Sequence, residues 1–445
     1  MKKVTCILLS AVMLCLVLAG CTKQEPLSFT GSDYTIPELD LSVIPENLKG
    51  TEYEYLYELT TVDASKDYMA HPDSVLLKNG NILTMYPAGH GKGAVLNKIS
   101  TDGGLTWNES IAGTPASWVN SQETPTVYRL RFTDGKTGDK LIMISANPKW
   151  GEEETAGGFN CSISIDEGKN WTEFQRFYDL ESENPVIPIV AMSSLTQLKE
   201  NGEFVDKWMG LFHDAEFYNY KTILTFDENG DMQWSTPQKY FADYREIEQK
   251  SNMCEVEVIR SEHGTGDELC LITRSNTKQM NSLLSFSTDE GKTWSEPAEA
   301  PAALNGERHK AEYTQDGRLF ITFRSIERGS KAEANALETT MGGWISEGWV
   351  AWVGTYDDLK NGTEGQYRIK LAHIYTDEQT EPEYYAGSDT GYCGNVVLSD
   401  GTIVTSAYGK FSPYEKTADG KSLKTYICSK RINLKDTDVL AEKLK

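Results

Sequence analysis

The sequence predicts an all-β fold, a six-bladed β-propeller made of four-stranded antiparallel blades. Two observations predict it: a turn of the form S-x-D-x-G-x-(T/N)-W that recurs at a nearly constant spacing, and a hairpin pattern that occurs once in each interval. Self-similarity at a fixed spacing of tens of residues is typical of repeat architectures. We therefore expect one repeating propeller rather than several unrelated domains.

The turn motif occurs in three complete copies and one degenerate copy. The complete copies lie at 100–107, 164–171 and 287–294, and the degenerate copy lies at 227–230. Successive aspartates are 64, 61 and 62 residues apart. The aspartate can accept backbone N–H groups of its own turn, glycine supplies a positive φ, and tryptophan closes the blade edge. We interpret the motif as a folding element, not as a catalytic or calcium site.

Each interval also holds an alternating apolar run, a turn containing glycine, and a second apolar run. This pattern is typical of a β-hairpin. Two β-sandwiches could supply as many strands, but they would not share one spacing. Six hairpins, each followed by more strand-like sequence, predict six four-stranded blades. The hairpins span residues 75–86, 126–145, 193–212, 256–273, 311–323 and 395–407.

The beginning of the chain resembles a bacterial export signal. Lys2 and Lys3 precede an apolar run that is too short to span a bilayer comfortably. The run ends in Leu-Ala-Gly-Cys, which resembles the lipobox, so we expect Cys21 to be lipidated; an ordinary cleaved signal is the alternative. We predict a signal peptide at 1–20, a tether at 21–50 and the propeller at 51–435. The protein would be an outer-membrane or periplasmic lipoprotein of the bacterial cell envelope.

Composition limits the partners. The chain has 43 basic and 66 acidic residues and a net charge of −23. Such a surface repels nucleic acid and anionic lipid, so we expect no nucleic-acid partner and membrane attachment through the anchor alone. We expect a monomer without a cofactor. Five widely spaced cysteines without a C-x-x-C pair predict buried thiols: Cys161, Cys254, Cys270, Cys393 and Cys428.

The propeller predicts where a site would form. The innermost strand of a blade starts at one face and the second strand returns to it, so these strand ends ring one mouth of the channel. Histidine, arginine and carboxylate side chains gather at these positions, which indicates a site on a rigid scaffold. Their ligand spacing does not favour a metal. The candidates are His71, His90, Lys92, Glu123, His213, Asp214, Glu255, Arg274, His309, Lys310, Arg324 and Tyr392.

The turns on a six-fold repeat resemble the sialidase (neuraminidase, BNR/Asp-box) superfamily over roughly residues 55–432. This resemblance implies a tyrosine nucleophile paired with a glutamate, an aspartate as acid and base, and three arginines that hold a substrate carboxylate. Tyr392 resembles the nucleophile, and Glu255 or Glu257 resembles its partner. Arg274 resembles the middle arginine.

The sequence also departs from the family pattern. Met-Ala-His-Pro stands at 69–72 instead of an Arg-Ile-Pro-like turn, and the third arginine is absent around 344–349. Gly-His-Gly-Lys at 89–92 replaces the acid/base aspartate, so we expect His90 to take this role. Cations at the mouth would bind the substrate carboxylate: Arg274, Arg324, Lys92 and Lys310.

These features predict a glycoside hydrolase that removes a terminal acidic sugar from glycans. A uronate lyase on the same propeller is an alternative, in which Tyr392 or His90 abstracts a sugar proton. A second alternative is a non-catalytic glycan-binding lipoprotein with sugars stacked on tryptophans. We expect the insertion at 327–347 to cover the mouth as a lid, although a disordered loop is also compatible. The tryptophans are Trp118, Trp150, Trp344 and Trp349.

Overall fold

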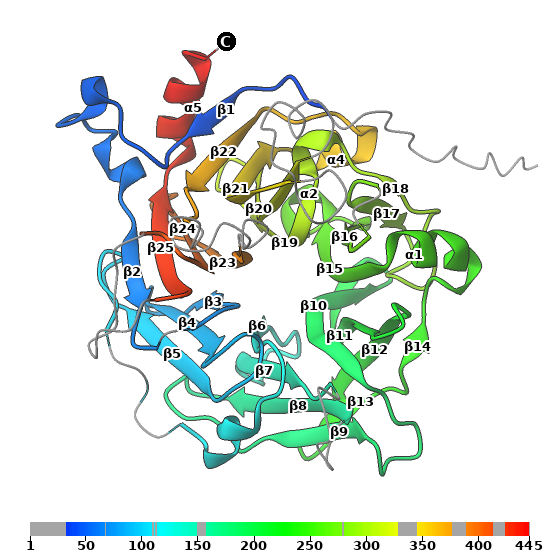
Figure 1. Cartoon of the computed structure of the whole chain (residues 1–445). Helices are drawn as coiled ribbons and strands as arrows, with labels where there is room; N and C mark the ends of the chain where they lie inside the picture. Colours follow the sequence, from blue (N-terminus) through cyan, green and yellow to red (C-terminus); the bar gives the residue numbers. More distant parts are fainter. Residues whose placement is uncertain are drawn as a thin grey trace, which may run out of the picture.

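In the described residues of the computed structural model, six β-sheets are arranged in a ring (Figure 1), which confirms the six-bladed β-propeller. Cys21, Trp150, Trp344 and most of the 327–347 insertion lie outside the residues that it describes. The described residues are 33–66, 68–108, 111, 114–148, 157–277, 280–327, 345–375, 389–412 and 423–444.

Each blade is formed largely by strands that follow one another along the chain, and the first strand is innermost. In the described part of the chain the sheets hold three to five strands, not four throughout. Blade one consists of β3 (Asp73–Leu76), β4 (Ile82–Pro87) and β5 (Val95–Ser100). Blade two consists of β6 (Thr126–Leu130), β7 (Lys140–Ala146), β8 (Gly157–Ser164) and β9 (Gln175–Asp179). Blade three consists of β10 (Pro188–Glu200), β11 (Glu203–Asp214), β12 (Asn219–Phe226), β13 (Met232–Trp234) and β14 (Gln238–Lys239).

The second half of the ring is built in the same way, with two additions from the start of the chain. Blade four consists of β15 (Met253–Arg260), β16 (Leu269–Ser275), β17 (Leu283–Ser287) and β18 (Ala298–Glu299). Blade five consists of β19 (Gly306–Tyr313), β20 (Leu319–Glu327), β21 (Ile345–Gly354), β22 (Tyr367–Ala372) and β1 (Glu38–Asp40). Blade six consists of β23 (Gly391–Val397), β24 (Ile403–Gly409), β25 (Tyr426–Ile432) and β2 (Thr60–Asp63).

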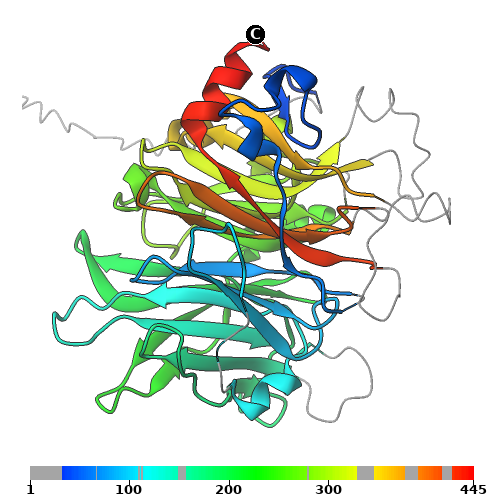
Figure 2. The same cartoon turned by 90° about the vertical axis from the view of Figure 1, so that its left-hand side faces the viewer.

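Both ends of the described chain fasten the ring. Strand β2 pairs with β25 and so completes the last blade with residues from the start of the chain (Figure 2). Strand β1 adds to β22 in parallel, and Leu41 beyond it is fully buried. Residues 38–41 of the predicted tether therefore pack on the propeller. Helix α5 (Leu434–Glu442) lies beside β1 (Figure 1), and the Tyr55 hydroxyl donates to Asp436 at 2.6 Å.

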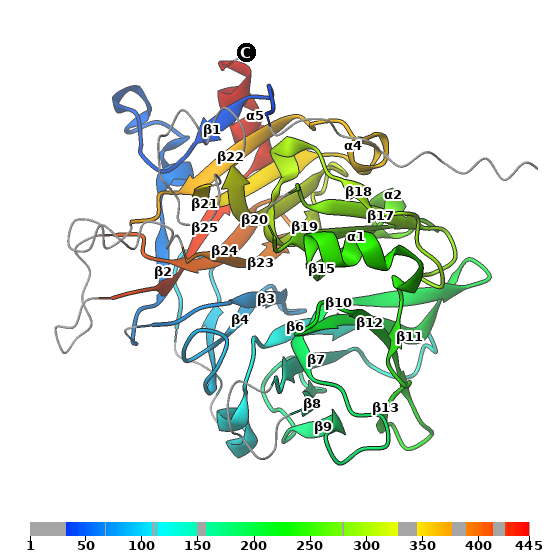
Figure 3. The ribbon, with the colours of Figure 1, turned by 45° about the vertical axis from the view of Figure 1, so that its right-hand side comes forward.

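Among the described residues, three short α-helices lie in the connections of blades four and five (Figure 3). Helix α1 (Arg245–Ser251) precedes β15, α2 (Ser261–Gly264) joins β15 to β16, and α4 (Tyr356–Asn361) joins β21 to β22. No helix among the described residues is long and apolar enough to cross a membrane.

The six predicted hairpins are confirmed by antiparallel pairing of the first two strands in every blade. The predicted cysteine thiols are also confirmed, because all five are free and buried. The interpretation of Trp118 and Trp349 as sugar platforms is wrong. Their side chains are 1% and 0% exposed, so they pack inside the propeller and have no surface left for a ligand.

The repeated turns bind their own aspartates. Oδ1 of Asp102 accepts hydrogen bonds from the Ser100 hydroxyl at 2.8 Å and from the Thr106 N–H at 2.9 Å, and Oδ2 accepts from the Thr106 hydroxyl at 2.5 Å. Asp166 and Asp289 accept the same set of bonds from their own turns. These aspartates are therefore engaged locally.

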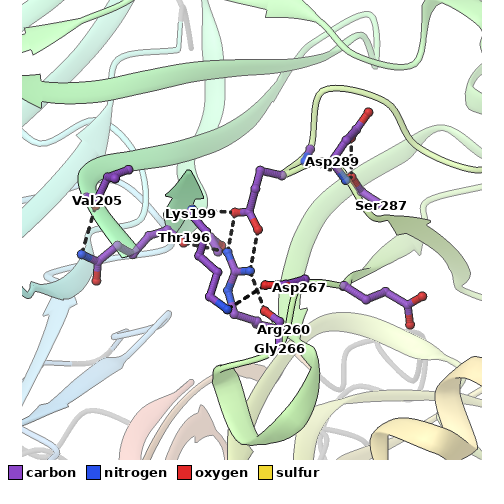
Figure 4. Close-up of polar contacts among 12 residues, drawn as sticks. Thr196, Lys199, Val205, Arg260, Gly266, Asp267, Ser287 and Asp289 are labelled. Atoms are coloured by element: carbon purple, nitrogen blue, oxygen red, sulfur yellow. Dashed lines mark hydrogen bonds and ion pairs between the residues drawn. The ribbon is translucent and has the colours of Figure 1, made fainter. Parts of the chain in front are cut away.

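The glutamate that follows the aspartate joins neighbouring blades. Glu290 accepts two hydrogen bonds from the guanidinium of Arg260, at 2.7 and 2.6 Å, and one from the Lys199 N–H at 2.9 Å. Arg260 also donates to the Gln197 carbonyl of blade three at 2.9 Å. Figure 4 shows Arg260 between Lys199 of blade three and the turn that carries Asp289. We call this arrangement the blade clasp.

A second blade clasp joins blades one and two. Glu167 accepts two bonds of 2.8 Å from Arg129 and one of 2.9 Å from the Lys78 N–H, and Arg129 donates to the Leu76 carbonyl at 2.9 Å. Lys78 and Lys199 lie in or beside the turn that joins the first strand of their blade to the second. This turn is at the opposite end of the first strand from its start. The clasps therefore connect blades at the face opposite the predicted mouth.

Arg260→Met is expected to destabilise the protein by about 3 kcal/mol, because it leaves the mostly buried Glu290 carboxylate without its partner. Urea unfolding would measure the loss. The matched control is Lys207→Met, which breaks an exposed ion pair with Glu200 and should cost less than about 1 kcal/mol. Equal losses in the two variants would show that the clasp does not stabilise the ring.

Candidate active site

A β-bulge opens the inner strand of blades four, five and six. In blade four Cys254 pairs with Arg274 and Glu257 pairs with Ile272, so β15 carries one extra residue. Within this bulge Glu255 has a φ of 51°, and Arg308 and Tyr392 have φ values of 53° and 49° in the matching bulges. Non-glycine residues rarely adopt positive φ, and those that do cluster at functional sites.

Two further blades hold a residue of this conformation at the same place, His71 before β3 and Val190 in β10. The second strands add the residues that pair at the mouth end. Arg274 faces Cys254, Arg324 faces Glu307, and Tyr408 faces Gly391. The site is thus assembled from equivalent positions in successive blades.

Tyr392, Glu255 and Arg274 form a buried chain of hydrogen bonds. The Tyr392 hydroxyl donates to Oε1 of Glu255 at 2.5 Å, and Nη1 of Arg274 donates to both carboxylate oxygens at 2.9 and 3.1 Å. Glu257 lies apart from Tyr392 and accepts from the Ala311 N–H at 3.1 Å. Glu255 is therefore the glutamate that contacts the tyrosine.

The environment separates the protonation states of this pair. Burial, followed by the charge of Glu255, raises the pKa of Tyr392 well above its usual value, so the phenol holds its proton. Burial alone would raise the pKa of Glu255, but Arg274, the Tyr392 hydroxyl, His213 and Arg308 outweigh it and lower this pKa. Transfer of the phenol proton to Glu255 is uphill at rest and has to accompany attack on a substrate.

Three arginines converge on the pair. Glu307 joins two of them, with Oε1 at 3.1 Å from Arg274 Nη2 and Oε2 at 2.7 Å from Arg324 Nη2. The Arg308 guanidinium lies 5.8 Å from the centre of the Tyr392 ring and donates to the Ser193 carbonyl at 2.8 Å. Arg308 thus adds a third guanidinium group to those of Arg274 and Arg324 near the pair.

His71 lies at the centre of these groups. Its ring centre is 4.1 Å from that of Tyr392 and 4.7 Å from that of His90. Burial, then His90 and the three arginines, lowers the pKa of His71 well below its usual value, so its imidazole is neutral. The Thr124 hydroxyl lies 3.2 Å from its Nδ1 and donates to Glu123 at 2.7 Å. Glu123 therefore helps to position His71 through the Thr124 hydroxyl.

A further carboxylate, that of Asp389, completes the mouth. Asp389 accepts hydrogen bonds from the hydroxyls of Tyr408, at 2.6 Å, and Tyr68, and lies 3.3 Å from Nδ1 of His90. Neither Asp389 nor Glu307 was predicted from the sequence. Asp389 lies three residues before Tyr392 and Glu307 lies one residue before Arg308, so their closeness to the predicted strand starts is the signal that could have indicated them.

Several predicted site residues lie outside this group. His309 packs on Phe323 and its Nε2 contacts the Leu304 carbonyl at 2.9 Å, so it faces away from the mouth. Lys310 forms an ion pair with Asp73 at 3.3 Å, on the channel side of β19. Asp214 accepts from the N–H groups of its own loop and lines a separate cavity of about 340 Å³.

The two remaining candidates differ in exposure. Lys92 is exposed on the loop after β4, whereas His213 is buried and stacks on Phe217 with a centroid distance of 5.9 Å. His213 lies close enough to Glu255 for their charges to interact. His213 therefore lies near the Tyr392–Glu255 pair.

The fold and its cluster define a six-bladed propeller with a charged site at one mouth. No family model and no curated protein matches the sequence. Similar solved structures include a Penicillium chrysogenum α-L-arabinanase in complex with arabinobiose, with a TM-score of 0.54, 13% identity, and coverage of 85% of this chain and 98% of that chain. Streptococcus pneumoniae NanB sialidase gives 0.52, 10%, 85% and 70%, and a Dyadobacter fermentans protein of unknown function gives 0.53, 14%, 84% and 97%. At these identities the likeness shows the fold alone.

His213 is expected to make stability depend on pH. Burial, together with Arg274 and against the charge of Glu255, lowers the pKa of His213 from 6.5 to about 4. The unfolded chain therefore binds a proton first as the pH falls, so the stabilisation is complete above pH 6.5 and is lost progressively towards pH 4. When the pH falls from 7 to 4.5, the unfolding free energy of wild type should decrease by about 2–3 kcal/mol more than that of His213→Gln.

Urea unfolding at the two pH values would measure this difference. The control is His263→Gln, which replaces an exposed histidine at the far face and should leave the pH dependence of wild type. If His213→Gln retained the full wild-type loss, the neutral buried imidazole would not be the cause.

Proposed function

We propose that the protein is a glycoside hydrolase that removes a terminal acidic sugar from glycans, with Tyr392 as its nucleophile. The observation that carries this proposal is the buried Tyr392–Glu255 pair surrounded by three guanidinium groups. An arabinanase and a sialidase among the similar folds support action on glycans. The substrate class rests on the charges at the mouth.

The hydrogen-bond geometry suits covalent catalysis. Tyr392 Oη attacks the anomeric carbon while its proton passes to Glu255, and the bond to the leaving oxygen breaks as that oxygen receives a proton from an acidic side chain at the mouth. Water then attacks the same carbon and gives a proton back to that side chain, the bond to Tyr392 breaks, and the phenol regains its proton from Glu255. A neutral phenol also approaches an anionic sugar without the repulsion that a carboxylate nucleophile would meet.

Arg274, Arg308 and Arg324 would bind the sugar carboxylate, because guanidinium groups hold carboxylates with paired hydrogen bonds. Glu307 fixes the orientation of two of them before substrate arrives. Lys310 was a candidate for this task, but its partner is Asp73.

One observation favours the uronate lyase as a second candidate. The neutral imidazole of His71 lies against the Tyr392 ring, and a neutral histidine can abstract a proton next to a carboxylate held by arginines. The glycan-binding alternative loses support, because the two described tryptophans that it required are buried.

We also propose that a lipid on Cys21 anchors the protein in the bacterial cell envelope, on the basis of the apolar run and lipobox-like residues that precede it. Metabolic labelling with a radioactive fatty acid in the native host should label wild type and not Cys21→Ser. Labelling of both proteins to the same extent would contradict the anchor.

Tyr392→Phe should lower kcat/KM for release of the terminal sugar by at least about 10³-fold, or roughly 4 kcal/mol of transition-state stabilisation. The assay uses oligosaccharides that end in sialic or uronic acids, with product masses as the readout. Hydrolysis adds one water to the products, whereas elimination adds none and creates an ultraviolet-absorbing enol ether.

Tyr240→Phe is the matched control, because this buried hydroxyl has no hydrogen-bond partner among the described residues. It should keep wild-type activity. The proposal is contradicted if wild type releases no sugar from any of these glycans, or if Tyr392→Phe is as active as Tyr240→Phe.

A further inference from the structure

The reaction needs an acid for the leaving oxygen, and the structure offers a group that the sequence did not indicate. Asp389 lies three residues before Tyr392, at the start of blade six, and its side chain is 27% exposed. The carboxylates of Glu255 and Glu307 are more deeply buried, and arginines hold both. Asp389 is therefore the carboxyl group of the cluster that is most accessible to a leaving group.

Hydrogen bonds fix the orientation of Asp389 from two sides. Tyr408 donates to Oδ1 at 2.6 Å and Tyr68 donates to Oδ2. Nδ1 of His90 lies 3.3 Å from Oδ2 and 2.7 Å from the Tyr68 hydroxyl. Tyr68, His90 and Asp389 thus form a closed triangle of polar atoms that can share a proton.

Burial of this triangle favours a proton on the carboxyl group, against the positive charge of Arg324. Burial raises the pKa of Asp389, and the Tyr408 hydrogen bond opposes this only in part. Burial and Arg324 lower the pKa of His90, against the attraction of Glu255. The other facing groups are Arg324, whose Nη1 is 3.7 Å from Oδ1, and the neutral His71 beside His90. Two coupled groups with opposite shifts form an acid and its hydrogen-bond acceptor.

We propose that Asp389 is the catalytic acid and base of this site, and that His90 and Tyr68 are positioning residues that orient its proton. The proposal rests on the proposed hydrolase function. The sequence predicted His90 for the acid/base role, whereas Asp389 belongs to a different blade.

Every proton that moves has a donor and an acceptor in both steps. The Asp389 hydroxyl gives its proton to the glycosidic oxygen as the bond from that oxygen to the anomeric carbon breaks and the bond from Tyr392 forms. The Asp389 carboxylate then takes a proton from the attacking water, whose oxygen replaces Tyr392 on the anomeric carbon. Glu255 accepts and returns the tyrosine proton, so the net reaction consumes one water.

Leaving-group dependence tests the proposal. Two substrates with the same sugar are compared: a 4-methylumbelliferyl glycoside, which leaves without protonation, and an oligosaccharide, which does not. Asp389→Asn should lower kcat/KM for the oligosaccharide by about 10²- to 10⁴-fold and for the umbelliferyl glycoside far less. Asp389→Asn should also remove the alkaline limb of the pH profile, since the acid acts only when protonated. Azide should restore turnover of the umbelliferyl glycoside by Asp389→Ala and form a glycosyl azide.

The positioning role has its own readout. His90→Gln and Tyr68→Phe should shift the alkaline limb, which a purely structural change would leave in place. Asp357→Asn, at an exposed position in α4, is the control for loss of a carboxylate and should match wild type. Melting temperatures confirm that each variant is folded.

The outcomes separate the two proposals. An inactive wild type on sialic and uronic substrates of both kinds means that the proposed function fails, and the role of Asp389 fails with it. An active wild type with equal losses on both substrates in Asp389→Asn overturns the role of Asp389 alone. A leaving-group effect in His90→Gln that Asp389→Asn lacks would return the acid/base role to His90.

Discussion

The geometry of the mouth depends on one backbone constraint, the residue of positive φ at the start of five inner strands. An extra residue in a strand interrupts the alternation of side chains between its two faces. Because the bulge recurs in successive blades, it directs Glu255, Arg308 and Tyr392 to the same end of the channel. Each such residue costs about 1–3 kcal/mol, which the surrounding structure has to offset.

Stabilising contacts between blades and the charged site lie at opposite faces of the ring. The repeated turns and the blade clasps lie at the far face, where Glu167 connects blade two to the backbone of blade one and Glu290 connects blade four to the backbone of blade three. The five residues of positive φ at the strand starts lie at the other face, with the Glu255–Arg274 and Glu307–Arg324 ion pairs. Stabilising contacts and chemistry are thus separated along the strands, which allows the mouth to hold charged groups that would not stabilise a fold by themselves.

The spacing of the turns was sufficient to predict the blades and, through their register, the gathering of Tyr392, Glu255, Arg274, Arg324, His71 and His90. It could not reveal a bulge at a non-glycine residue, and a bulge decides which of three neighbours faces the ring. For this reason Arg308 lies in the site, while His309 packs on Phe323. Tryptophan at a strand end was equally ambiguous, since burial depends on contacts between blades.

In the proposed reaction Tyr392 forms a covalent bond to the sugar. A glycosyl fluoride with a second fluorine beside the anomeric carbon forms such a bond quickly and breaks it slowly, so intact-protein and peptide mass spectrometry can locate it. We predict one added fluorosugar per chain, on Tyr392, formed from a sialic or uronic acid reagent. Labelling of another residue, or release of fluoride without any labelled protein, would contradict the nucleophilic role of Tyr392.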